Sequence, residues 1–159
     1  MLQTKFSRID KIIYMTDGTG AQYKNRHNFI NLYMRQLDFG IVAEWHFHAT
    51  AHGKGPYDGI GGTIKRKAAR ESLTRPLKNQ ITNAKQLFDW ASSTNLNISF
   101  EYSTQEEHDI MALALEDRFH AAKTVKDTQK YHSFVPLDNG TLRAKKFSLY
   151  DEFDVVRLI

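Results

Sequence analysis

The fold is decided first by KIIYMTDGTG, the segment at residues 11–20. Its apolar, partly β-branched beginning predicts a buried strand over 11–16, and the glycine-containing end predicts a tight turn. Asp17 then lies at the carboxyl end of that strand. Downstream, apolar residues recur at helical spacing within 24–38, and Gly40 follows where a helix C-terminus is expected. The first forty residues therefore predict a strand followed by an amphipathic helix.

A second strand is expected over residues 41–49. Alternation along it predicts one polar and one aromatic face, with Glu44, His46 and His48 on the first and Trp45 and Phe47 on the second. A glycine-rich loop should follow over residues 50–62, and a helix over 63–73, with Asp58 just ahead of that helix. The order strand-helix-strand-helix indicates an α/β fold.

The remainder of the chain, residues 77–159, predicts a small α+β region. We expect a helix over 83–92 with Thr82 as its N-cap, then a strand over 97–102. A further helix should end near Ala122. Its capping box would be Ser103 with Glu106 or Thr104 with Glu107, and its buried side would be Ile110, Leu113, Ala114 and Phe119.

The C-terminal part of this region predicts a β-hairpin. Two β-prone stretches, at residues 131–137 and 141–148, are joined through Asp138-Asn139-Gly140, which is a strong hairpin signal.

The composition is that of an ordinary globular domain of 159 residues, 41% of them apolar and 25% charged, with a formal net charge of +4. The chain has no cysteine, which excludes a disulfide framework and a thiolate zinc site and fits an intracellular protein. No apolar run approaches the roughly 18 residues of a membrane span. The first residues lack the apolar core of a signal peptide, so we expect no membrane partner.

Asp17 and Asp58 are candidate ligands for a divalent cation. One helix and one strand separate them, so both could meet at the carboxyl edge of a sheet. There a cation relieves their mutual repulsion and activates a water or polarises a phosphate, which is the chemistry of phosphoryl transfer. Alternatively, Asp17 is a turn residue and Asp58 a helix N-cap, both common roles of aspartate.

Three histidines offer a different metal site. His46, His48 and His52 could bind zinc through imidazole nitrogens, with Asp58 as an oxygen ligand. Without cysteine this is a weaker zinc pattern, and the alternative is that the histidines are simply solvated on a half-exposed strand.

The excess of basic residues is concentrated in the middle of the chain. Residues 54–85 contain eight basic residues and only two acidic ones, Asp58 and Glu71, which gives this segment a charge of +6. The bases are Lys54, Lys65, Arg66, Lys67, Arg70, Arg75, Lys78 and Lys85. A helix with this charge predicts contacts to a phosphate backbone, and the alternative is a solvated helix face.

Several motifs resemble those of a widespread group of transposon-derived proteins in invertebrate genomes. They are TDGTGAQYKN at 16–25, FGI at 39–41, AEWHF at 43–47, HGKGPYDGIGGTIKR at 52–66 and YHSFVP at 131–136. The resemblance spans nearly the whole chain. Where the group usually has a cysteine before the aspartate of the HGKGP motif, this chain has Tyr57.

More distantly, the order of elements is similar to the second half of the RNase H-like catalytic core of DDE/D transposases and retroviral-type integrases. The resemblance implies that residues 1–76 form part of such a core, followed by the α+β region at 77–159. Asp17 and Asp58 would be the second and third members of a triad that binds Mg²⁺ or Mn²⁺, and His52 would orient water or a phosphate. The DNA backbone would be held by Lys24, Lys54, Lys65, Arg66 and Arg70.

The same resemblance implies a function and leaves one catalytic residue missing. The full-length ancestor would cleave DNA phosphodiesters at transposon ends and transfer strands in the nucleus. Only sixteen residues precede Asp17, too few for the strands that carry the first catalytic aspartate. We therefore expect a fragment that is inactive alone, exposes an unpaired strand edge and self-associates as a homo-oligomer. The alternatives are a non-catalytic nucleic-acid-binding remnant and a histidine-based metal-binding protein.

Overall fold

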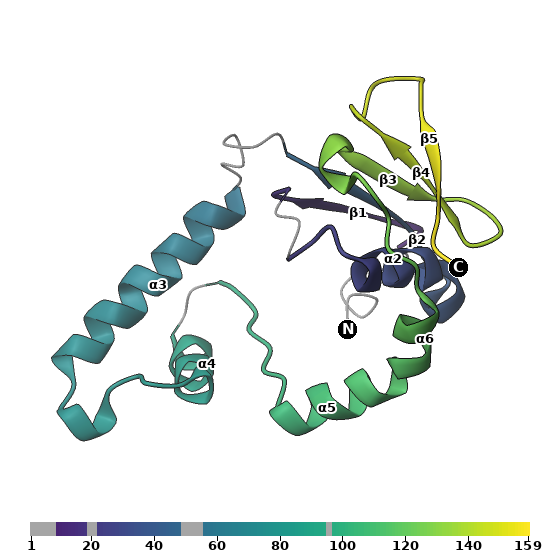
Figure 1. The fold of residues 1–159 in the computed structure, drawn as a ribbon. Coiled ribbons are helices and arrows are strands. Elements are labelled where there is room, and N and C mark those ends of the chain that lie inside the picture. Colours follow the sequence, from purple (N-terminus) through teal and green to yellow (C-terminus); the bar gives the residue numbers. More distant parts are fainter. Residues whose placement is uncertain (1–8, 19–21, 49–55, 95–96) are drawn as a thin grey trace. The chain divides into compact units, whose positions relative to one another are not determined.

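The computed structural model describes residues 9–18, 22–48, 56–94 and 97–159 of this chain (Figure 1). The chain divides into two compact units. Residues 1–53 and 114–159 form unit 1, and residues 54–113 form unit 2. None of the helices in the described ranges is long and apolar enough to cross a membrane.

Unit 1 is built on a five-stranded mixed sheet whose strand order is β1-β2-β3-β4-β5. β1 and β2 run parallel, and the remaining neighbours are antiparallel. The strands are β1 (Lys11–Thr16), β2 (Val42–Phe47), β3 (Ser133–Pro136), β4 (Thr141–Lys145) and β5 (Asp154–Arg157). The predicted α/β class, its strand-helix-strand-helix start and the hairpin β3-β4 are confirmed. The sequence predicts a division of the chain at residue 76. The sheet takes β1 and β2 from before this residue and β3, β4 and β5 from after it.

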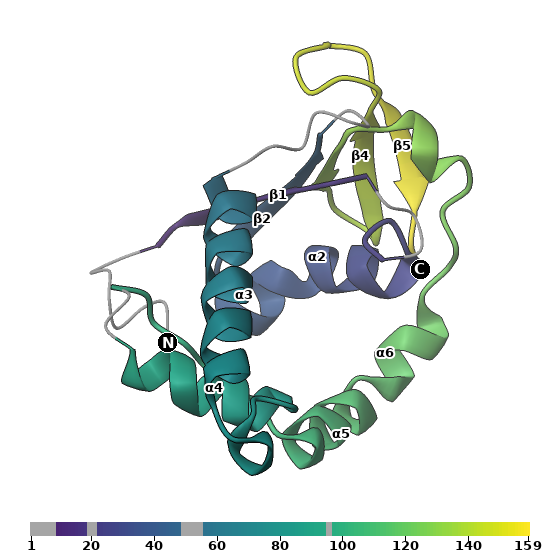
Figure 2. The same cartoon turned by 90° about the vertical axis from the view of Figure 1, so that its left-hand side faces the viewer.

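Helix α2 (Arg26–Phe39) links the two parallel strands and lies against one face of the sheet (Figures 1 and 2). Its start is fixed by Asn25, whose side chain accepts a hydrogen bond from the Asn28 amide at 3.0 Å. Its end is fixed by Gly40, which adopts the left-handed conformation with φ 67° and donates to the Gln36 carbonyl. Both caps are local, so the helix forms where the sequence predicts it.

The face of the sheet under α2 holds the core of unit 1. Phe29 and Leu32 of α2 pack with Ala43 and Phe47 of β2 and with Phe134 of β3. Short segments complete this unit: α6 (Glu116–Ala121), which contacts α2, and the 3₁₀ turn η2 (Thr128–Lys130). Strands from both ends of the chain therefore share one core.

β1 forms one edge of the sheet. Within the described residues it pairs only with β2, and its outward side chains Ile13 and Met15 are 54% and 46% exposed. The expectation of an open, apolar strand edge is therefore met in the described part of the chain.

Unit 2 consists of helices α3 (Pro56–Thr74), α4 (Ala84–Ser93) and α5 (Gln105–Ala114), with the 3₁₀ turn η1 (Leu77–Asn79). The boundary of the unit falls at Leu113, one residue before α5 ends. α3 begins earlier than predicted, because residues 56–62 are helical rather than a loop. Proline is favoured in a first helical turn, and the carboxylate of Asp58 interacts well with the positive end of the helix dipole. Helix α4 begins one residue late, because Asn83 rather than Thr82 is its N-cap.

Three further predictions for this region are corrected. Residues 97–102 do not form a strand, since the structure gives them no strand partner. The long helix breaks at Leu115 into α5 and α6. Of its predicted buried residues only Phe119 packs against a core, whereas Ile110, Leu113 and Ala114 are exposed. The capping box uses Thr104 and Glu107, whose backbone amides and side chains bond reciprocally.

Candidate functional site

Asp17 lies directly after β1, as predicted, and is exposed. The carboxyl ends of β1 and β2 meet at this edge of the sheet, where Thr16 is paired with Phe47. The Trp45 indole donates to the Thr16 hydroxyl at 2.8 Å and the His48 amide donates to the Thr16 carbonyl at 2.9 Å. These bonds hold the end of β1, next to Asp17, against β2.

Lys24 is buried beside Gly18, the residue that follows Asp17, with only 5% of its surface exposed. Its ammonium donates to the Tyr131 carbonyl at 2.8 Å and lies 4.7 Å from the centroid of the Phe47 ring. A Cβ at Gly18 would lie 3.5 Å from the Nζ atom, so the ammonium is next to the glycine that follows Asp17. Burial lowers the pKa of Lys24. A DNA contact by this lysine, which the resemblance implies, would require the side chain to leave this position.

His46 bridges two partners on the open face of the sheet. Its Nε2 atom lies 3.2 Å from the Glu44 carboxylate and its Nδ1 atom 2.9 Å from the Ser148 hydroxyl. Lys11 forms an ion pair with Glu44 at 2.6 Å. Burial acts to raise the pKa of Glu44, but the hydrogen bonds and charges of Lys11 and His46 together outweigh it, so the pKa lies below its ordinary value.

This arrangement bears on the predicted zinc site. Both ring nitrogens of His46 are engaged, so a metal ion would have to displace one of these hydrogen bonds. His48 follows the end of β2, and His52 lies outside the described residues. Among the residues that the structure describes, no three histidine, aspartate or glutamate side chains are grouped to hold a metal ion.

Asp58 lies in the first turn of α3 and is exposed. It belongs to unit 2, whereas Asp17 belongs to unit 1. Asp17 is therefore found where the sequence places it, whereas Asp58 lies inside the helix rather than just ahead of it. The convergence of the two carboxylates on one cation stays a prediction. Lys54, like His52, lies outside the described residues.

Helix α3 has one packed and one basic face. Ile64 and Ala68 pack against Trp90 and Ala91 of α4. The rest of the helix surface is exposed and carries four bases within six residues: Lys65, Arg66, Lys67 and Arg70. Burial at every third or fourth position explains this division, because it leaves the intervening residues facing solvent.

The bases of unit 2 fall into two groups. Arg75 and Lys85 are paired, with Glu71 and Asp89 respectively, one helical turn away. By contrast, Lys65, Lys67 and Arg70 have no hydrogen bond or ion pair within the described residues, and Arg66 bonds only to the Thr63 hydroxyl at 3.3 Å. The exposed face of α3 is thus a run of positive charge with no carboxylate partner in the described part of the chain.

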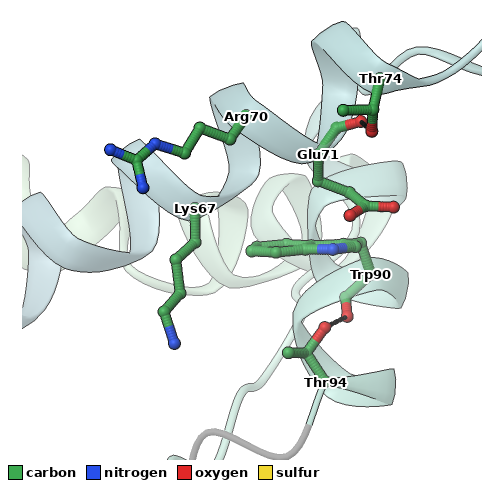
Figure 3. Close-up of a pocket in the computed structure, with 6 residues that line it drawn as sticks. All are labelled: Lys67, Arg70, Glu71, Thr74, Trp90 and Thr94. Carbon is green, nitrogen blue, oxygen red and sulfur yellow. Dashed lines mark hydrogen bonds between the residues drawn. The ribbon is translucent and has the colours of Figure 1, made fainter.

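A cavity of about 330 Å³ opens between α3 and α4 (Figure 3). It is lined by Lys67, Arg70, Glu71, Thr74, Trp90 and Thr94. The helix predicted over 83–92 carries no ligand-binding motif, so the sequence does not indicate this cavity. Its walls come from α3 and α4, whose packing against each other the sequence does not specify. The only signal in the sequence is the basic composition of residues 54–85.

A family model described as "Domain of unknown function (DUF8701)" matches residues 1–148. No curated protein and no solved structure matches the chain significantly.

Proposed function

This chain belongs to the DUF8701 family, and we propose that it is a transposon-derived protein that binds DNA through the basic face of α3. The observation that carries the proposal is the set of exposed bases on this face, Lys65, Arg66, Lys67 and Arg70, without carboxylate partners in the described residues. Side-chain cations that are not neutralised within the protein are free to bind DNA phosphates. Each such contact releases counterions from the DNA, and this release favours binding.

The order of elements supports an RNase H-like origin. Parallel neighbours β1 and β2 are joined by α2, and Asp17 follows β1 at the edge where both strands end. Asp58 lies in the next helix, at its N-terminal turn. These are the positions that the resemblance to DDE/D transposases and integrases assigns to the second and third catalytic carboxylates.

Asp17 and Asp58 would hold Mg²⁺ or Mn²⁺. Carboxylate oxygens are the ligands that such cations prefer, and both side chains are exposed, so a hydrated ion can reach either. When bound, the metal supplies charge stabilisation for attack on a phosphodiester by water or a 3′ hydroxyl. With two carboxylates rather than three, we expect this chain to bind DNA without cutting it. Cleavage and strand transfer at transposon ends, in the nucleus, belong to its full-length ancestor.

Binding is tested by the salt dependence of DNA affinity. Fluorescence anisotropy with a labelled duplex would compare the wild type with the triple variant Lys65→Gln, Arg66→Gln, Arg70→Gln. Losing three phosphate contacts should reduce the slope of log K against log salt by about 2.7, since each contact contributes about 0.9. The matched control removes three exposed lysines of unit 1, Lys123, Lys126 and Lys130, with the same change in net charge. Equal effects of the two triple variants would reject α3 as the interface.

A second experiment addresses catalysis. Mn²⁺ is titrated while nicking of a supercoiled plasmid is followed, with Asp17→Asn and Asp58→Asn as variants. We expect DNA binding by all three proteins and nicking by none. Mn²⁺-dependent nicking by the wild type that either variant abolishes would show that the chain is itself a nuclease.

A further inference from the structure

We propose that the cavity between α3 and α4 holds one unpaired nucleotide of a DNA strand, with its base against Trp90 and its phosphate on Lys67 and Arg70 (Figure 3). This inference rests on the proposed function and names the form of DNA that the site recognises. A volume of about 330 Å³ is at the lower end of the range for ligand sites, about 300 to 1,000 Å³. That space suits a single nucleotide rather than a longer stretch of strand.

Trp90 supplies an aromatic wall that is already held in place. The residue is 8% exposed and packs with Ala68 and Ala91 in the core of unit 2, and part of it lines the cavity. A ring fixed by core packing loses little conformational freedom when a ligand arrives. Stacking on aromatic side chains is how proteins hold unpaired bases, because every base has a π face.

Lys67 and Arg70 supply the anion-binding part of the cavity. They are three residues apart on α3, so their side chains are neighbours on the helix surface. Both line the cavity, and neither has an ion pair in the described part of the chain. In Figure 3 the two side chains leave α3 in different directions, Lys67 passing beside Trp90 and Arg70 pointing away from the ring, so a phosphate held by both requires Arg70 to turn toward the cavity. An anionic group there would neutralise two cations that have no ion-pair partner among the described residues.

Apart from the Trp90 indole N–H, which is a donor, the remaining polar side chains of the lining are acceptors. The Thr74 hydroxyl donates its hydrogen to the Glu71 carbonyl and the Thr94 hydroxyl donates to the Trp90 carbonyl, both at 2.8 Å. Their free lone pairs, and the carboxylate of Glu71, can therefore only accept hydrogen bonds. A ligand that fits must combine an anion with a hydrogen-bond donor. An unpaired nucleotide meets both requirements, because cytosine carries a donor in its exocyclic amino group and thymine carries one in its N3–H.

Fluorine NMR of the protein labelled with 5-fluorotryptophan tests this proposal, because the chain has two tryptophans, Trp45 and Trp90. The variant Trp45→Phe assigns the two signals. Addition of a single-stranded cytosine hexanucleotide should shift the Trp90 signal and leave the Trp45 signal in place. A thymine hexanucleotide should shift the same signal, and deoxycytidine monophosphate should bind far more weakly than either hexanucleotide because it lacks the flanking phosphate contacts.

Lys67→Gln should weaken the hexanucleotide response about tenfold, the size of one lost charged hydrogen bond. Its matched control is Lys78→Gln, which removes an exposed lysine of the same unit outside the cavity. DNA binding by anisotropy without any shift of the Trp90 signal would overturn the nucleotide site and leave the proposed function standing. An equal shift with duplex DNA, or equal affinity for the mononucleotide, would also overturn it. Absence of all DNA binding would instead overturn the proposed function, and the site with it.

Discussion

Truncation of Phe134 should be among the most destabilising single changes in unit 1. The side chain is 0% exposed and lies near three aromatic rings, with centroid distances of 4.4 Å to Phe29, 5.8 Å to Phe47 and 6.0 Å to Tyr131. Its strand, β3, is hydrogen-bonded on both sides, so the backbone cannot collapse into the space left by the ring.

The expected magnitude follows from this environment. Replacing a buried phenylalanine by alanine costs about 3–5 kcal/mol, and the cost is largest where the site cannot relax. Complete burial, three aromatic neighbours and a central strand place Phe134→Ala in the upper half of that range, at about 4–5 kcal/mol. Phe134→Leu retains most of the volume and should cost about 1.5 kcal/mol.

Urea unfolding followed by fluorine NMR measures both units in one sample, because Trp45 lies in unit 1 and Trp90 in unit 2. The Trp45 transition of Phe134→Ala should shift to much lower urea, since domains are stable by only about 5–15 kcal/mol. The Trp90 transition should stay where it is. A loss of less than about 1 kcal/mol at Trp45 would refute the central position assigned to Phe134. Equal shifts of both signals would show that the units unfold together.

Three other changes probe the turn after β3, a glycine of helix α3 and the contacts of Glu44. Gly140→Ala should destabilise unit 1 by about 1–2 kcal/mol or more, because φ is +71° and a Cβ would lie 2.9 Å from Ile159 Cγ1. Gly59→Ala, with nothing within 4 Å in helix α3, should instead stabilise unit 2 by up to about 1 kcal/mol. Thermal unfolding measures both, and a stabilised Gly140→Ala would contradict the turn geometry. The pKa of Glu44 is lowered on folding, so the unfolded chain binds more protons. Its contribution is present above the ordinary pKa of 4.5 and lost as pH falls through the folded value. Glu44→Gln should flatten the stability profile in this acid range, and an unchanged profile would mean that the Lys11 and His46 contacts do not favour the charged form.

The elements that the sequence predicts well are those whose signals are local. β1 is a short apolar run that ends directly before Asp17, and α2 carries its own caps in Asn25 and Gly40. The hairpin depends on Asn139 and Gly140, both of which adopt the left-handed conformation. Asparagine tolerates this conformation, and glycine adopts it freely because it has no side chain. In each case the residues that decide the structure lie within the element or directly beside it.

Predictions fail where a distant partner decides the structure. Residues 97–102 alternate like a strand but have no neighbouring strand in the structure, so the pattern alone does not make one. The apolar spacing of α5 predicts a buried side, yet Ile110 and Leu113 remain exposed. Helix α3 shows the opposite error, because three glycines suggested a loop where Pro56 and Asp58 favour a helix start.

The candidate site was predictable only in part, for the same reason. The positions of Asp17 and of the basic residues on a helix follow from their own neighbourhoods. By contrast, Lys24 binds a carbonyl 107 residues away, and His46 bonds to a hydroxyl 102 residues away. No pattern in a single sequence reports contacts over such separations. Burial of Lys24 therefore removes from the exposed surface a residue that its motif alone places on DNA.

Trp90 has two roles that connect binding with stability in unit 2. It is the largest of the three buried residues in the core of this unit, with Ala68 and Ala91, and it also lines the cavity beside Lys67 and Arg70. Unit 1, by comparison, has a core of eleven buried residues. A small core leaves unit 2 with less stability of its own, and any ligand that binds only the folded form adds to that stability. Because the same indole packs the core and contacts the ligand, nucleotide binding should order the interface between α3 and α4 and thereby fix the basic face that holds the phosphate backbone.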